Sequence, residues 1–100
     1  MRIIAKRTLW QFWETHPRGA QAETPLRVWY STVEDADWAS PADVKATYGD
    51  ASILQESRVV FNISGNKFRL VARINYPYRV VYVRFVGTHE EYDAIGVETI

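Results

Sequence analysis

The sequence predicts an α+β domain with the element order β-α-α-β-β-β-α, in which an antiparallel sheet carries a helical hairpin on one face. Two observations predict it. Apolar residues recur at helical spacing over the first 37 residues, and after residue 57 they alternate with a period of two. A chain of 100 residues with 47% hydrophobic and 24% charged residues has the size and composition of one soluble domain. We therefore assign residues 1–100 to a single domain.

The N-terminal part is predicted to open with a short strand over residues 2–5. Apolar residues at helical spacing then predict a first helix over residues 6–16, which Pro17 and Gly19 end. His16 stands at the C-terminal end of this helix, directly before the proline. We expect it to be a solvated residue at the end of the helix.

A second helix is predicted to begin with Thr24 as its N-cap and Pro25 as its first residue, and to end in the acidic run 34–37. The two helices form a hairpin, and their shared apolar stripe is expected to belong to the core. This stripe consists of Leu9, Trp10, Trp13, Trp29 and Val33. Ser40-Pro41 repeats the cap-plus-proline signal and predicts a short third helix.

Three strands are predicted in the second half, over residues 58–63, 67–75 and 79–86, with a three-residue hairpin loop between the first two. Thr88 then follows as the predicted N-cap of a short final helix. Glu91, three residues later, completes the pattern of a capping box.

The net charge is zero, but basic and acidic residues are concentrated in different parts of the chain. Residues 58–88 contain six basic residues and no acidic one, whereas residues 89–100 contain four acidic residues and no Lys or Arg. Such asymmetry is typical of a surface that binds a polyanion. The alternative is that these cations line the solvated face of a sheet and pair with acidic helices, and charge alone leaves both interpretations open.

Strand alternation predicts a basic, aromatic-containing sheet face. Lys67, Arg69 and Arg73 have the opposite parity to the apolar positions of their strand, and Tyr82 and Arg84 share one parity on the next strand. Cations and aromatic rings on one face suit phosphates and stacked bases. The residues predicted to bind RNA are Lys67, Arg69, Arg73, Tyr82 and Arg84. Solubility alone would also explain such residues.

The candidate catalytic residues are His89, Tyr92 and Asp93, which one helical turn brings near one another. Cleavage of a phosphodiester needs one group to deprotonate the ribose 2′-OH, another to protonate the leaving 5′-oxygen, and a cation such as Arg69 to stabilise the charged phosphorus centre. Asp93 either fixes the tautomer of His89 or acts only as a charge at the helix N-terminus, and we favour the second. Residue types alone also favour a purely structural His89, a capping residue.

Several classes of function find no support in the sequence. There is no Cys, so disulfides, thiolate metal sites and a Cys nucleophile are excluded. The motifs GxxxxGK[ST], GxGxxG, HExxH and the EF-hand loop do not occur. Nothing resembles a signal peptide or a membrane span. We therefore expect a cytoplasmic protein that needs neither a cofactor nor a metal ion.

Two motifs carry a resemblance to a known family. They are Phe61-Asn62-Ile63-Ser64-Gly65-Asn66-Lys67-Phe68-Arg69-Leu70 and Thr88-His89-Glu90-Glu91-Tyr92-Asp93, with Tyr82-Val83-Arg84 between them. Together they resemble the HigB family of bacterial toxins from type II toxin-antitoxin systems, within the RelE/ParE-like superfamily. The resemblance covers the whole chain and implies a RelE-like toxin domain. The chain departs from these often strongly basic toxins in being neutral, with a pI of about 6.7.

The resemblance implies a ribosome-dependent mRNA endonuclease that inhibits translation. It also implies a partner, a HigA-like antitoxin with a helix-turn-helix domain, and it allows a heterotetramer of the two proteins. In this family the basic strand face corresponds to Lys67, Arg69 and Arg73, and the catalytic element to His89, Tyr92 and Asp93. Two other functions stay open: a non-catalytic module that binds RNA or protein, and a ParE-like toxin that inhibits gyrase.

Overall fold

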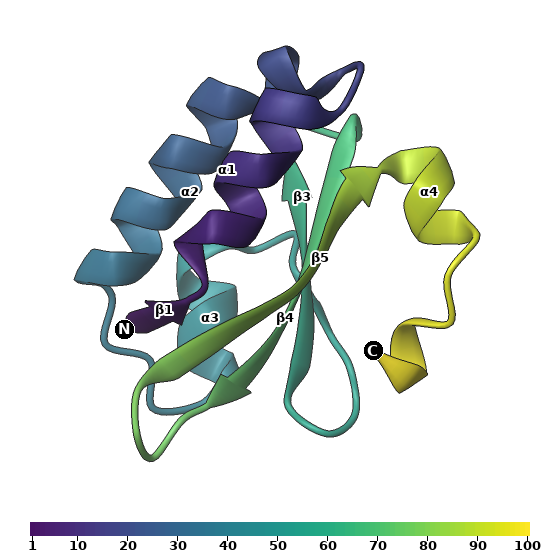
Figure 1. The fold of residues 1–100 in the computed structure, drawn as a ribbon. Coiled ribbons are helices and arrows are strands. Elements are labelled where there is room, and N and C mark those ends of the chain that lie inside the picture. Colours follow the sequence, from purple (N-terminus) through teal and green to yellow (C-terminus); the bar gives the residue numbers. More distant parts are fainter.

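The computed structural model describes all of residues 1–100 and confirms the α+β class (Figure 1). Eleven elements follow one another along the chain. They are β1 (Arg2–Ile4), α1 (Lys6–Thr15), the 3-10 helix η1 (Gly19–Ala22), α2 (Glu23–Asp35), α3 (Pro41–Thr47), β2 (Ser52–Ile53), β3 (Arg58–Ile63), β4 (Phe68–Asn75), β5 (Val80–Thr88), α4 (His89–Asp93) and the 3-10 helix η2 (Val97–Thr99). None of the helices is long and apolar enough to span a membrane.

The sheet has five strands in the order β1-β5-β4-β3-β2. β3, β4 and β5 form the predicted antiparallel meander, but β1 pairs with β5 in parallel. The prediction of a purely antiparallel sheet was therefore wrong, and the sheet is mixed. The apolar period indicates which residues form a strand, but it carries no information on the direction of the neighbouring strand.

α1 and α2 pack side by side on one face of the sheet, which we call the hairpin face (Figure 1). The main core lies between these two layers and includes the predicted Leu9, Trp13, Trp29 and Val33, each at most 6% exposed. Trp10 is 49% exposed, so its assignment to the core was wrong. Leu9, Phe12 and Trp13 form the buried stripe of α1, and Trp10 lies about 100° around the helix from Leu9.

The start of α2 also differs from the prediction. η1 runs directly into α2, so the N-cap position belongs to Ala22, and Thr24 lies inside the helix. η1 begins at Gly19, where any Cβ would collide with the Phe12 carbonyl oxygen. The glycine thus permits a close approach of the two segments and does more than end α1. At α3 the prediction is confirmed, with Ser40 as N-cap and a proline in the first turn.

The opposite face of the sheet carries Arg69 and Arg73 of β4 together with Tyr82 and Arg84 of β5, and we call it the basic face. α4 and the C-terminal segment lie on this side of the sheet (Figure 1). The basic face is not polar throughout, because Val60 and Val71 pair across β3 and β4 at its centre and are buried. This apolar pair separates the cations at the two ends of β4.

Candidate functional site

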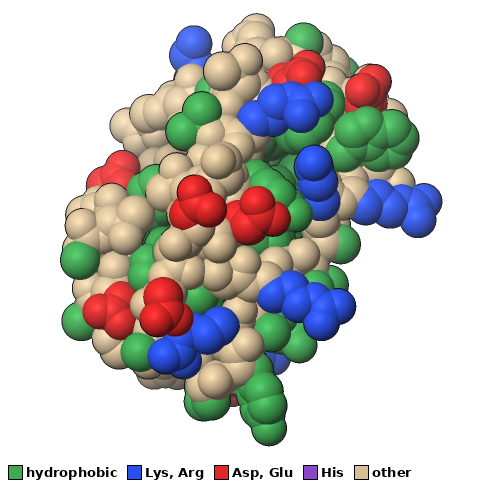
Figure 2. Space-filling model, turned by 90° about the vertical axis from the view of Figure 1, so that its left-hand side faces the viewer, with side chains coloured by type: hydrophobic (Ala, Val, Ile, Leu, Met, Phe, Trp, Pro, Cys, Tyr) green, Lys and Arg blue, Asp and Glu red, His purple; other side chains and the backbone are tan.

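The six basic residues of segment 58–88 fall into two classes. Arg58 pairs with Glu56 at 2.8 Å and Arg79 pairs with Asp37 at 2.6 Å, so their charges are compensated. The other four make no ion pair with a carboxylate: Lys67, Arg69, Arg73 and Arg84. The side of the molecule formed by α2 differs, since acidic and basic side chains are interspersed on it (Figure 2). The basic face therefore presents Arg69, Arg73 and Arg84 without a carboxylate at ion-pair distance, and Lys67 stands unpaired at its end.

A cleft of about 450 Å³ opens on the basic face, and Arg73, Tyr82 and Arg84 line it together with the turn after β4. Arg73 pairs with Tyr82 in the β4–β5 ladder. The register shifts between Val71 and Ala72, which leaves Arg84 in a bulge without a partner on β4. Parity alone did not predict this irregularity, but Arg84 still reaches the same cleft as Tyr82.

Lys67 and Arg69 lie at the other end of β4. The prediction of Lys67 as a strand residue was wrong: β4 begins at Phe68, so Lys67 stands in the preceding turn, where the pleat does not set its direction. The backbone carbonyl of Lys67 accepts a hydrogen bond from the His89 N–H at 3.1 Å. Arg69 pairs with Gly87, two residues before His89, and its guanidinium donates to Asn66.

Arg69 and Arg73 therefore stand on the same side of the sheet, Arg69 in one group of cations with its neighbour Lys67 and Arg73 in another with Arg84. Arg69 and Arg73 are four residues apart, which is about 13 Å along a strand. The Arg69 end is next to α4, and the Arg73 end contains the cleft. The cations at the Arg69 end and those at the Arg73 end are therefore two separate groups on the sheet.

The first turn of α4 confirms the predicted capping box. The Thr88 hydroxyl accepts a hydrogen bond from the Glu91 N–H at 3.1 Å, and the Thr88 N–H donates to Glu91 Oε1 at 2.8 Å. The bond from the Thr88 N–H, joined by contacts with His16, lowers the pKa of Glu91 below its ordinary value of 4.5. Glu91 therefore remains a carboxylate at neutral pH and can accept hydrogen bonds from several donors.

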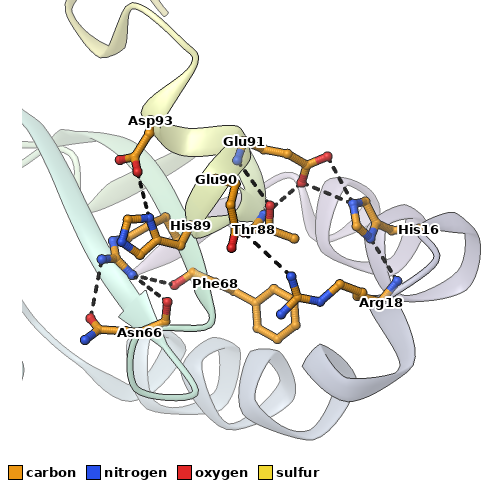
Figure 3. A network of polar contacts seen from close by, with 10 residues as sticks. His16, Arg18, Asn66, Phe68, Thr88, His89, Glu90, Glu91 and Asp93 are labelled. Atoms are coloured by element: carbon orange, nitrogen blue, oxygen red, sulfur yellow. Dashed lines mark hydrogen bonds and ion pairs between the residues drawn. The ribbon is translucent and has the colours of Figure 1, made fainter.

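His89 and Asp93 meet on α4 as predicted, with Nδ1 of the imidazole 2.9 Å from Asp93 Oδ2 (Figure 3). The oxygen lies off the direction of the ring N–H, so this is the distance of an ion pair without the alignment of a hydrogen bond. Nδ1 is buried although the side chain is 44% exposed, which leaves Nε2 as the nitrogen available to a substrate. Asp93 ends α4, so its interpretation as a charge at the helix N-terminus was wrong.

Tyr92 is half-buried on the same helix turn, and its hydroxyl makes no hydrogen bond within the protein. The structure thus pairs His89 with Asp93 and places Tyr92 on the same short helix without a polar contact to either. The catalytic roles of these three residues and of Arg69 stay predictions.

His16 is a partner of α4 that sequence reasoning missed. Its Nε2 lies 3.1 Å from both carboxylate oxygens of Glu91, and its Nδ1 accepts a hydrogen bond from the Arg18 N–H at 3.0 Å (Figure 3). The expectation of a solvated His16 was therefore wrong. The contact joins residues 75 positions apart, and no local pattern signals such a pair.

Comparison with known proteins assigns the family. Residues 22–95 match the HigB toxin family, described as the RelE-like toxic component of a toxin-antitoxin system. The chain belongs to the HigB family. A toxin of this family acts together with an antitoxin, so an antitoxin is the partner that membership implies.

Curated HigB relatives cover nearly the full chain. It is 30% identical over 95 residues to the mRNA interferase toxin HigB of Escherichia coli K12 and to the mRNA interferase HigB of Shigella flexneri, with 93% of this chain and 88% of each relative covered. It is 25% identical over 97 residues to the mRNA interferase HigB of Escherichia coli O6:H1, with 95% and 91% covered. The family match includes α2, the basic face and α4 but not α1.

Proposed function

We propose that this HigB-family chain is an mRNA endonuclease toxin that cleaves messages on the ribosome and so inhibits translation, with residues 1–100 acting as one toxin domain. The names of its relatives support RNA cleavage. The observation that carries the proposal is His89. Its Nδ1 is buried beside Asp93, its Nε2 is available, and it stands next to Lys67 and near the end of a sheet face whose cations have no carboxylate partner.

The reaction that fits these residues uses the RNA's own 2′-OH as nucleophile. The 2′-oxygen attacks the adjacent phosphorus, a P–O2′ bond forms, and the P–O5′ bond breaks. The 2′-OH proton goes to a base, and an acid supplies a proton to the leaving 5′-oxygen. The products are a 2′,3′-cyclic phosphate and a free 5′-OH, so the ends of the fragments identify the chemistry.

Each residue of the site has a role in this scheme. His89 transfers a proton through Nε2, and the Asp93 carboxylate beside Nδ1 orients the ring. Arg69 compensates the charge that develops on the phosphate oxygens. The free hydroxyl of Tyr92 donates to the leaving oxygen, or its ring orients the neighbouring base.

The remainder of the basic face holds the message. Arg73 and Arg84 bind phosphates, and the ring of Tyr82, which is 38% exposed, stacks on a base in the cleft. Lys67 binds a phosphate at the opposite end. The positive charge of this face also suits an acidic segment of the antitoxin, which would block RNA access.

The finer description of the partner belongs to the same proposal. We infer a HigA-like antitoxin with a helix-turn-helix domain, and a heterotetramer of two toxins and two antitoxins. Action on translating ribosomes places the free toxin in the bacterial cytoplasm. The family match supports an antitoxin, and size measurement on the co-purified complex tests the tetramer.

The test compares the wild type with His89→Ala on messages under translation in a reconstituted system. We expect cleavage to fall ~10²-fold or more, the usual effect of losing one general acid or base, while ribosome association persists. Mapping of fragment ends should find a 5′-OH on the wild-type products. Tyr92→Phe retains the ring, so a loss of rate in that variant assigns the chemistry to the hydroxyl.

Other outcomes decide between the alternative functions. RNA binding without cleavage by the wild type would indicate a non-catalytic module. A DNA-damage response with intact messages would indicate a toxin that inhibits gyrase. Normal cleavage by a folded His89→Ala variant would assign the catalysis to the arginines alone.

A further inference from the structure

α4 carries the proposed catalytic residues but has little to hold it in place. It is five residues long, and none of its residues is buried. A helix this short has no stability of its own, because nucleation is costly and few internal hydrogen bonds form. Its position must therefore come from contacts with the rest of the protein. Besides the bond from His89 N–H to Lys67 and the packing of α4 against β4 and β5, the polar contacts come from the turn after α1 (Figure 3).

His16 makes the better-defined of two contacts from that turn. Arg18 N–H donates to Nδ1, so the proton of the neutral imidazole stands on Nε2. Nε2 then donates to the Glu91 carboxylate, whose two oxygens both lie 3.1 Å away. Both ring nitrogens are satisfied in one tautomer. The second contact, Arg18 to Glu90 at 3.6 Å, is longer and more exposed, and such pairs contribute little.

In the contact between His16 and Glu91, the core of the protein holds His16 in place, whereas Glu91 has no such support. The imidazole is 20% exposed and lies against the Phe12 ring, with centroids 4.6 Å apart. Phe12 in turn meets the buried Phe68 edge-on at 5.8 Å. Glu91 is 48% exposed and is held by His16 and its own capping box alone. The hairpin core therefore holds His16 rigidly, and His16 holds Glu91.

We propose that His16 is a positioning residue: by binding Glu91 it fixes α4 so that His89 stands at the Arg69 end of the basic face. The inference rests on the proposed function for the importance of His89. His16 lies on the hairpin side of the sheet and outside the two HigB-like motifs. Its effect on cleavage passes through Glu91. Loss of this contact lets α4 shift without unfolding the hairpin or the sheet, since α4 contributes no buried residue to the core.

A matched pair of substitutions separates the two nitrogens of His16. The side-chain nitrogen of Gln can occupy the position of Nε2, so His16→Gln keeps the donor to Glu91 and loses the acceptor for Arg18. The shorter Asn places its oxygen near the position of Nδ1, so His16→Asn keeps the acceptor and loses the donor to Glu91. Both variants lose the aromatic contact with Phe12 equally, so the difference between them reports on Glu91.

Two readouts are compared on the full-length chain. In the cleavage assay, His16→Asn should lower kcat by roughly 10- to 100-fold, the cost of misplacing a reacting group, with KM for ribosome-bound message little changed. His16→Gln should retain most of the wild-type kcat. In hydrogen exchange on the free protein, the amides of residues 89–94 should lose protection in His16→Asn and keep it in His16→Gln.

The results that overturn the proposal are distinct from those that overturn the catalytic role of His89. Equal kcat values for His16→Asn and the wild type, or equal losses in both His16 variants, contradict positioning through Glu91. Unchanged exchange at residues 89–94 in His16→Asn contradicts it without any activity measurement. A fully active His89→Ala variant, in contrast, contradicts the proposed chemistry while leaving the exchange result to decide whether His16 fixes α4.

Discussion

The two faces of β4 have different roles, because one packs in the core and the other carries the cations. On the hairpin face this strand presents Phe68, Leu70, Ala72 and Ile74, all at most 3% exposed and all in the main core. On the basic face the same strand presents Arg69, Val71 and Arg73. Successive residues of one strand thus serve stability on one side and binding on the other. Substitutions on the first face should change the free energy of unfolding, and most substitutions on the second should change RNA binding or cleavage.

The basic face also contains a structural element of its own. Val60 and Val71 are buried between the two groups of cations, and Phe85 pairs with Val71 on the same face. The Arg58 guanidinium nearby donates to the C-terminal Ile100 carbonyl at 2.9 Å, which ties the end of the chain to this face. The two faces of β4 therefore differ most at the two ends of the strand, where Arg69 and Arg73 stand on the basic face.

The largest effect on stability is expected for Phe61→Ala on the hairpin face. Phe61 is 1% exposed and meets the rings of Trp29, Trp38 and Tyr48 within 6.1 Å. Loss of such a ring from a core destabilises a protein by about 3–5 kcal/mol. Thermal and denaturant unfolding measure the loss, and Val28→Ala, at a position 59% exposed on α2, is the control. Similar unfolding of the two variants would contradict the division between faces.

A smaller effect is expected for Val71→Ala, the apolar position of the basic face. Val71 is fully buried, so the loss of two methyl groups should cost about 2 kcal/mol. Because Arg69 and Arg73 stand on either side of it, the same variant tests whether packing at the centre aligns the cations. We expect cleavage per folded molecule to remain near the wild-type level. A large loss of cleavage in fully folded protein would show that the two functions are not separable on this face.

The smallest effect on stability is expected for Arg73→Ala, which should change the free energy of unfolding by less than about 0.5 kcal/mol. RNA binding should weaken, and the slope of log K against log salt should fall by about 0.7 for one lost phosphate contact. A single-stranded oligoribonucleotide with 2′-O-methyl groups prevents cleavage during the measurement. Arg7→Ala, an exposed cation of α1, is the matched control. Equal slopes for both variants would place the RNA elsewhere.

Local sequence patterns predicted much of the fold and part of the candidate site. The period of two on β4 placed Arg69 and Arg73 opposite the core, and the spacing of Thr88 and Glu91 predicted the capping box. Two features of β4 and β5 that strand alternation did not predict share a cause. Lys67 stands one residue outside its strand, and Arg84 stands in a bulge. Both depend on where pairing with a neighbouring strand begins or slips.

The sequence by itself determined the α+β class, the two buried helix stripes and the basic face, because each follows from the periodicity of residues close together in the chain. Only the tertiary structure decided the parallel pairing of β1 with β5 and the contact of His16 with Glu91. These join segments at opposite ends of the chain, and their formation depends on the packing of the hairpin against the sheet. Local propensity determines which elements form, and packing determines which distant side chains meet.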